Sequence, residues 1–169
     1  RINQLLQGIG ESTMLRTEAW EFYQFGRHLE RSSQTARILD VKYHMLQSNP
    51  AISGSNIEIS YWTSILKSCS GYEPFLKHAN IIENQVGNAV AEFLILEESF
   101  PRSVLYCLKE CFNSATSISY RSKSKISNTT LETLKQLNKW LSNDETKQLI
   151  KAKHRPIVII TSNNEKELP

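Results

Sequence analysis

The longest amphipathic segment of the sequence, residues 17–47, constrains the fold more than any other feature. Its apolar residues recur at intervals of three, four and seven positions, a spacing typical of one helix face: Phe22, Phe25, Leu29, Ala36, Leu39, Tyr43 and Leu46. Thr17 is placed to cap the start of this helix, and Pro50 follows its end. Because such a face must be covered by other helices, the sequence predicts a helical bundle with Leu29 in its core.

Further helices are predicted over residues 72–78, 83–96 and 99–118, and around Trp62 and Leu134. For the apolar run Phe93 to Leu96 a buried strand is an alternative, because the spacing of apolar residues does not distinguish a helix from a strand in so short a segment. Residues 156–161 are β-branched and apolar, which is typical of a buried strand. The predicted fold is therefore all-α, a helical bundle of about five helices with one short C-terminal β-like segment. We divide the chain into a helical domain, residues 1–142, and a tail, residues 143–169.

Composition narrows the classes of function. The chain has 169 residues and a net charge of +3, which is too small to argue for a nucleic-acid partner. It has no apolar run long enough to cross a membrane, so a membrane protein is not expected. Three cysteines, an odd number, argue against a disulfide scaffold and predict a cytoplasmic protein.

Four side chains of the long helix, Arg27, Glu30, Arg31 and Gln34, lie three or four positions apart and share one face. One hypothesis is an anion-binding site of an enzyme or enzyme subunit, because arginine binds carboxylate and phosphate through paired hydrogen bonds. Arg102 would then help to hold the anion, and Glu30 or Glu92 would handle protons. The other hypothesis, which we favour, is an ionic clamp between helices, with acids such as Glu92, Glu97 or Glu98 as partners.

Other reactive side chains offer little chemistry. Cys107 and Cys111 are four positions apart, and we expect them to be buried as small hydrophobic residues rather than to bind zinc. His28 faces away from the apolar stripe, so we expect it at the surface. Neither a catalytic triad nor a glycine-rich phosphate loop is recognisable. The sequence therefore predicts no metal ion and no cofactor, and it favours a non-catalytic protein.

Several separated motifs resemble, in the right order, the alpha-E domain proteins of bacteria. They are Glu11-Ser12-Thr13-Met14, Phe25-Gly26-Arg27-His28-Leu29-Glu30-Arg31, Thr35-Ala36-Arg37-Ile38-Leu39-Asp40 and Phe100-Pro101-Arg102-Ser103-Val104. The resemblance covers residues 1–120. This segment is similar to the C-terminal half of a typical member, so we expect a preceding half. It implies an all-helical protein with no assigned chemistry, whose relatives are encoded beside ATP-grasp and transglutaminase-like proteins. A non-catalytic accessory or scaffold protein of a peptide- or amide-modifying system is therefore expected, with such an enzyme as partner, and a homodimer is a further possibility.

Residues 144–169 resemble a different family, the sensor-1 region of MoxR-type AAA ATPases. The matching strand there ends in an asparagine that senses the γ-phosphate, and Asn163 is the counterpart that the resemblance implies. The chain lacks the phosphate-binding loop and the metal-holding acid that ATP hydrolysis needs, so no ATPase activity is predicted. A third hypothesis, a fragment of an AAA system, predicts that residues 156–161 join a parallel sheet.

Overall fold

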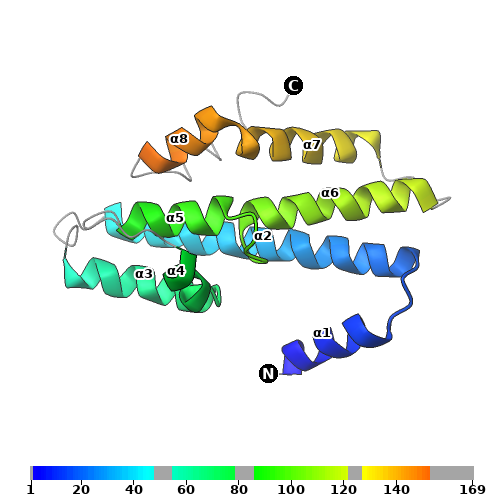
Figure 1. Ribbon diagram of the computed structural model, residues 1–169, viewed down its shortest axis with the longest axis horizontal. Coiled ribbons are helices and arrows are strands. Elements are labelled where there is room, and N and C mark those ends of the chain that lie inside the picture. The colour runs from blue at the N-terminus through cyan, green and yellow to red at the C-terminus, as the bar shows by residue number, and fades with distance from the viewer. Residues whose placement is uncertain (1, 48–54, 79–85, 122–126, 153–169) are drawn as a thin grey trace.

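The computed structural model describes residues 2–47, 55–78, 86–121 and 127–152. Throughout these ranges the regular structure is helical and no strand occurs, which confirms the all-α prediction. The described residues form eight helices rather than about five (Figure 1): α1 (Ile2–Thr13), α2 (Glu18–Gln47), α3 (Asn56–Ser68), α4 (Tyr72–His78), α5 (Val86–Leu96), α6 (Val104–Arg121), α7 (Asn128–Ser142) and α8 (Asp144–Ala152).

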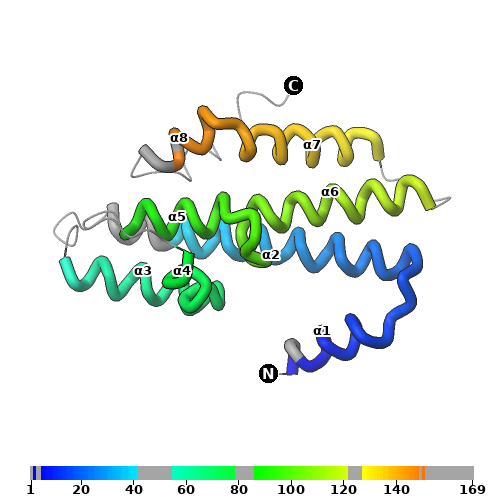
Figure 2. Tube along the Cα trace, viewed as in Figure 1, coloured from blue at the N-terminus to red at the C-terminus, as the bar shows by residue number. Residues whose placement is uncertain are grey.

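The helices form three layers, and the middle layer contains a long pair of helices (Figures 1 and 2). In the middle, α2 packs along α6 in the most extensive helix contact of the fold, and α5 continues the line of α6. One outer layer consists of α7 and α8, which pack on α6 and α5, respectively. The other holds α3 and α4 near one end of α2 and α1 near the other. The described part therefore builds one bundle, in which only α1 stands apart from the main helix contacts.

The C-terminal part differs most from the sequence prediction. Helix α8 was not predicted, yet Ile150 is fully buried and belongs to the same core cluster as Leu39. The run Phe93 to Leu96 is part of helix α5, so the alternative of a strand there is wrong. The predicted β-like segment, residues 156–161, lies outside the described residues.

The centre of the core lies where α3, α4, α5 and the loop from α5 to α6 meet. Phe93 contacts the Phe75 ring at a centroid distance of 5.5 Å and stacks on Phe100 at 4.8 Å. Beside them Trp62 is buried against Gly87, where a Cβ atom would lie only 2.8 Å from the indole nitrogen. These aromatic contacts fix the loop that follows α5, and that loop carries Arg102.

The face of α2 that meets α6 is polar along its first half. Its buried residues are Gln24, His28, Ser32 and Thr35, and Leu39 continues the same face. The predicted burial of Leu29 is wrong, because Leu29 is 45% exposed and Phe22 on the same stripe is 47% exposed. In the first half of α2 the most buried positions are therefore Gln24 and His28. Two other residues of the predicted stripe do face the core, because Leu39 is fully buried and Phe25 packs against the core cluster.

Helix α6 explains why α2 turns a polar face toward it. The buried side chains along α6, including the residue just before it, are mostly small near this contact. They are Ser103, Cys107, Cys111 and Ser114. Small side chains allow two helix backbones to approach closely, and hydroxyl and thiol groups then find backbone partners. Thr35 donates to the carbonyl oxygen of Arg102 at 2.9 Å, and the Cys111 thiol lies 3.5 Å from the carbonyl oxygen of Phe25. We call this contact the α2–α6 seam.

Helix ends follow local chemistry that the sequence only partly revealed. The start of α2 at Glu18 agrees with the predicted cap at Thr17. Helix α6 begins at Val104 rather than near Ser99, because the Ser103 hydroxyl accepts from the backbone N–H of Tyr106. Among the described residues, no helix combines the length and apolar character that a membrane span requires.

Candidate functional site

A cleft of about 670 Å³ opens beside the first half of α2. Its walls come from α1, from α2 and from the loop that precedes α6, and its lining residues are Leu6, Gln7, Phe22, Tyr23, Gly26, Arg27, Glu30, Arg31, Gln34 and Arg102. We call this site the arginine cleft. The hydrogen bond from Thr35 to the carbonyl oxygen of Arg102 ties the loop to α2 and so positions the third arginine.

The structure brings together four of the five side chains predicted for an Arg/Glu site. Arg27, Glu30, Arg31 and Arg102 all line the cleft, whereas Glu92 on α5 is not among the lining residues. The sensor-1-like residue Asn163 lies outside the described residues.

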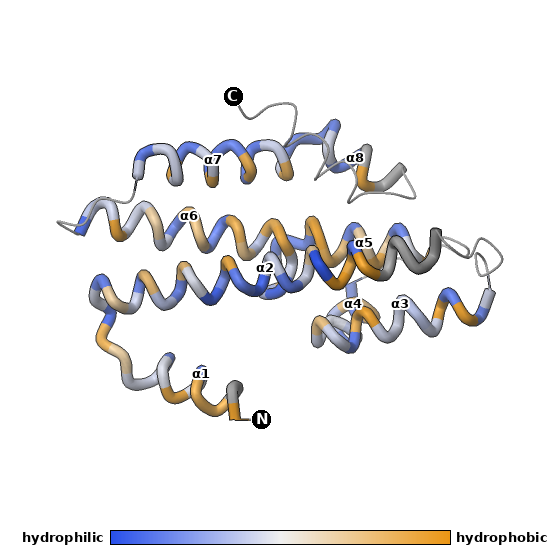
Figure 3. Tube along the Cα trace, turned by 180° about the vertical axis from the view of Figure 1, so that it is seen from behind, coloured by the Kyte–Doolittle hydropathy of each residue, from blue (hydrophilic) through white to orange (hydrophobic). Residues whose placement is uncertain are grey.

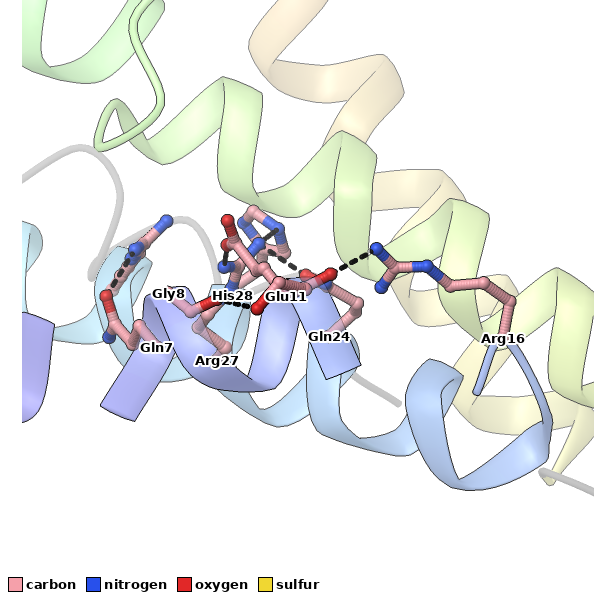
Figure 4. A network of polar contacts seen from close by, with 9 residues as sticks. Gln7, Gly8, Glu11, Arg16, Gln24, Arg27 and His28 are labelled. Carbon is pink, nitrogen blue, oxygen red and sulfur yellow. Dashed lines mark hydrogen bonds and ion pairs between the residues drawn. The ribbon is translucent and has the colours of Figure 1, made fainter. Parts of the chain in front are cut away.

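Arg27 is held by acceptors on two helices (Figure 4). Its guanidinium forms an ion pair with the Glu11 carboxylate of α1 and donates to the side-chain oxygen of Gln24. The backbone of Glu11 is also bonded, because Arg16 in the connection from α1 to α2 donates to its carbonyl oxygen at 2.6 Å. The positive charge of Arg27 is therefore compensated within the protein.

His28 lies beneath this ion pair rather than at the surface, so the prediction of an exposed histidine is wrong. It is 4% exposed, and its Nε2 lies 3.3 Å from a guanidinium nitrogen of Arg27. Because guanidinium groups only donate, we assign Nε2 as acceptor and place the ring proton on Nδ1. Burial lowers the pKa of His28 to about 4, with the charges of Arg27 and Arg31 acting in the same direction. The ring is therefore neutral at neutral pH.

Arg31 and Arg102 are not compensated in the same way. Arg31 donates to the side-chain oxygen of Gln7 at 3.3 Å, and within the described part of the chain neither arginine forms an ion pair with a carboxylate. Burial lowers the pKa of Arg31, and the nearby positive charges of Arg27 and Arg102 lower it further. Glu30 is exposed and accepts a 2.9 Å hydrogen bond from Gln34. Arg27, Arg31 and Arg102 therefore bring three positive charges close together in the lining of the cleft.

Gly26 lies in the middle of α2 and lines the cleft. A Cβ atom at this position would meet no atom within 4 Å, so protein packing does not require a glycine here. Glycine inside an exposed helix is nevertheless about 0.8–1.0 kcal/mol less favourable than alanine. Because Gly26 has no side chain, this part of the cleft is open space.

Gly26→Ala is therefore expected to raise the free energy of unfolding by about 0.5–1 kcal/mol, measured by urea denaturation. Gly87→Ala is the matched control, since its Cβ would lie 2.8 Å from the indole nitrogen of Trp62. Overpacking of this kind lowers stability by about 1–3 kcal/mol. A destabilised Gly26→Ala protein would contradict the open space at the cleft.

Sequence reasoning missed the contribution of α1 to this site. Glu97 and Glu98, two of the acids expected to pair with the arginines, bond instead to Ser99 at 2.6 Å and to Lys109 at 2.7 Å. The acid on Arg27 is Glu11. A signal was present, because Gln7 and Glu11 are four positions apart and so share one face of α1.

The thiols close to the cleft are buried in the α2–α6 seam. Cys107 and Cys111 are both inaccessible, as predicted, and burial raises the pKa of Cys107 to about 11 and that of Cys111 to about 12. Both are protonated at neutral pH, and a thiol in that form is a poor nucleophile. Neither thiol is among the described lining residues of the cleft, whose charged side chains are three arginines and one glutamate.

Comparison with protein families places the Glu-Arg pair in a known context. A family model named Alpha-E, described as a predicted alpha-helical domain with a conserved ER motif, matches residues 2–165. The chain belongs to the Alpha-E family. Glu30-Arg31 is the only Glu-Arg pair in the sequence and is therefore the candidate for that motif. No curated protein and no solved structure matches the chain.

The family match confirms the resemblance drawn from the sequence motifs. It extends past residue 120 and through the region assigned to the tail. In this Alpha-E chain both residues of the Glu-Arg pair line the arginine cleft, together with Arg27 four positions before Arg31. The family description and the geometry thus converge on the same stretch of α2.

Proposed function

We propose that this Alpha-E chain is a non-catalytic helical accessory domain that binds a carboxylate or phosphate group in the arginine cleft. The observation that carries the proposal is the pair Arg31 and Arg102, which line the cleft without an acidic partner among the described residues. Guanidinium groups held close to each other repel, and an anion between them relieves that repulsion. Arginine also offers paired donors that match both carboxylate and phosphate oxygens.

Three further features support binding. Gly26 keeps part of the cleft open, although alanine would favour the helix. The neutral state of His28 keeps it from adding to the charge of the cluster or protonating a ligand at neutral pH. The Glu11–Arg27 pair, in turn, holds α1 against α2 and so completes the wall of the cleft.

For the partner, we propose an ATP-grasp or transglutaminase-like enzyme of a cytoplasmic peptide- or amide-modifying system. This assignment rests on the resemblance to alpha-E proteins and on the character of the cleft, which offers binding groups for a substrate or partner rather than reactive ones. Co-purification from the native cell, with identification of the enzyme by mass spectrometry, tests it.

Arg31→Gln and Arg102→Gln are each expected to weaken anion binding by about tenfold or more, because hydrogen bonds to charged groups contribute about 1.5–3 kcal/mol. Titration of isotope-labelled protein with sodium phosphate and with sodium acetate at low salt, followed by NMR, measures the dissociation constants. Arg37→Gln is the matched control, since Arg37 is an exposed arginine of α2 that does not line the cleft. The proposal fails if neither anion saturates the wild-type protein, or if all three variants bind equally well.

A further inference from the structure

The lining of the cleft combines two kinds of side chain. It carries the guanidinium groups of Arg27, Arg31 and Arg102, and it also carries the apolar side chains of Leu6 and Phe22. Leu6 is 61% exposed, and Phe22 is nearly half exposed. An inorganic ion would use only the guanidinium groups and would leave these apolar side chains in water. The cleft therefore fits a ligand that joins an anionic group to an apolar one.

The formal charges favour a ligand with a single negative charge. Glu11 compensates Arg27, so Arg31 and Arg102 remain, opposed by the Glu30 carboxylate that also lines the cleft. One positive charge is left over. A carboxylate matches it, whereas a phosphate monoester at neutral pH carries about −1.5 to −2 and would be repelled by Glu30.

The lining also includes uncharged hydrogen-bonding groups. Gln7 from α1 and Gln34 from α2 both line the cleft, and their amides donate and accept in the same way as peptide groups. Gln7 already accepts from Arg31, and Gln34 already donates to Glu30, so both amides are oriented beside the charged side chains. A volume of about 670 Å³ lies within the range of about 300–1,000 Å³ found for small-ligand sites.

We infer that the arginine cleft binds the C-terminal carboxylate of a peptide whose last side chain is apolar. Arg31 and Arg102 hold the carboxylate, Gln7 and Gln34 face the last peptide groups, and the terminal side chain packs against Leu6 and Phe22. This inference rests on the proposed anion-binding function and names the ligand of the same site. It gives the two kinds of lining side chain separate roles, because the arginines recognise the charge and the apolar residues recognise the terminal side chain.

Fluorescence polarisation with a fluorescein-labelled Gly-Gly-Ala-Leu peptide tests the inference on the full chain. The free-carboxylate peptide is expected to bind, and the same peptide with a C-terminal amide at least tenfold more weakly, because the amide lacks the charge that Arg31 and Arg102 recognise. Replacing the terminal leucine of the peptide by aspartate is expected to weaken binding several-fold, since Leu6 and Phe22 then face a charged group.

Two variants test the geometry. Gly26→Leu leaves every charge in place but adds a bulky side chain to the lining of the cleft, and Arg102→Gln removes one guanidinium group. Each is therefore expected to weaken binding of the carboxylate peptide at least tenfold. Arg37→Gln is the control and is expected to bind as the wild-type protein does. Far-ultraviolet circular dichroism of each variant verifies that its helices are intact.

The outcomes separate the inference from the proposed function. Equal affinity for the carboxylate and amide peptides overturns the inference, as does undiminished binding to the folded Gly26→Leu protein. If inorganic phosphate binds with the expected dependence on Arg31 and Arg102 while the peptide does not, the inference fails and the proposed anion-binding function stands. If neither phosphate, acetate nor the peptide binds, both fail.

Discussion

Leu39→Ala is expected to lower the free energy of unfolding by about 2–5 kcal/mol, measured by urea denaturation followed by circular dichroism. Leu39 has no exposed surface and belongs to the cluster that joins α2 to the aromatic core around Trp62 and Phe93. Truncation removes buried methyl groups and leaves a cavity that a closely packed helix pair cannot fill by small shifts.

Leu29→Ala is the matched control, because it is the same substitution on the same helix. Leu29 is nearly half exposed, so the change is expected to alter stability by less than about 0.5 kcal/mol. The pair of variants therefore measures which face of α2 is turned toward the bundle. Equal effects at the two positions, or a larger effect at Leu29, would contradict the orientation of α2 described above.

The orientation of α2 illustrates what a sequence reveals of a helix bundle and what it does not. The spacing of apolar residues predicted the existence, the start and the length of the helix, and the helix observed runs from Glu18 to Gln47. It correctly placed Leu39 in the core and Phe25 against the core. It wrongly buried Leu29 and missed the burial of His28. The error has a physical origin, because the α2–α6 seam is built from small polar side chains, and hydropathy along one helix carries no information about its partner.

The candidate site was predicted in the same partial way. Local spacing correctly placed Arg27, Glu30 and Arg31 on one face, because residues three and four apart on a helix are neighbours whatever surrounds them. Arg102 joins them through a contact between distant segments, and the sequence offered it only as one possible member. Glu11 was not foreseen as the partner of Arg27. Its spacing from Gln7 places both on one face of α1, but which helix that face meets depends on tertiary packing.

Lowering the pH from about 6.5 to about 4 is expected to remove up to about 3 kcal/mol of stability through protonation of His28. In the folded protein, burial and the charges of Arg27 and Arg31 lower the pKa of His28 from 6.5 to about 4, while the charge of Glu11 opposes the shift. The unfolded chain therefore binds the proton first as the pH falls. This contribution to stability is fully present above pH 6.5 and is lost as the pH approaches 4.

His28→Gln isolates this contribution, because glutamine keeps a hydrogen-bonding side chain and does not titrate. Free energies of unfolding for the wild-type and variant proteins are measured between pH 7.5 and pH 4. Other titrating groups contribute to both proteins, so the difference between them is expected to change in the variant's favour by up to about 3 kcal/mol as the pH falls. A difference that stays constant over this range would show that the α2–α6 seam accepts a charged histidine. The neutral ring also matters to the cleft, because His28 contacts the guanidinium of Arg27. Arg27 already lies near the positive charges of Arg31 and Arg102. A fourth positive charge there would favour opening of the α2–α6 seam.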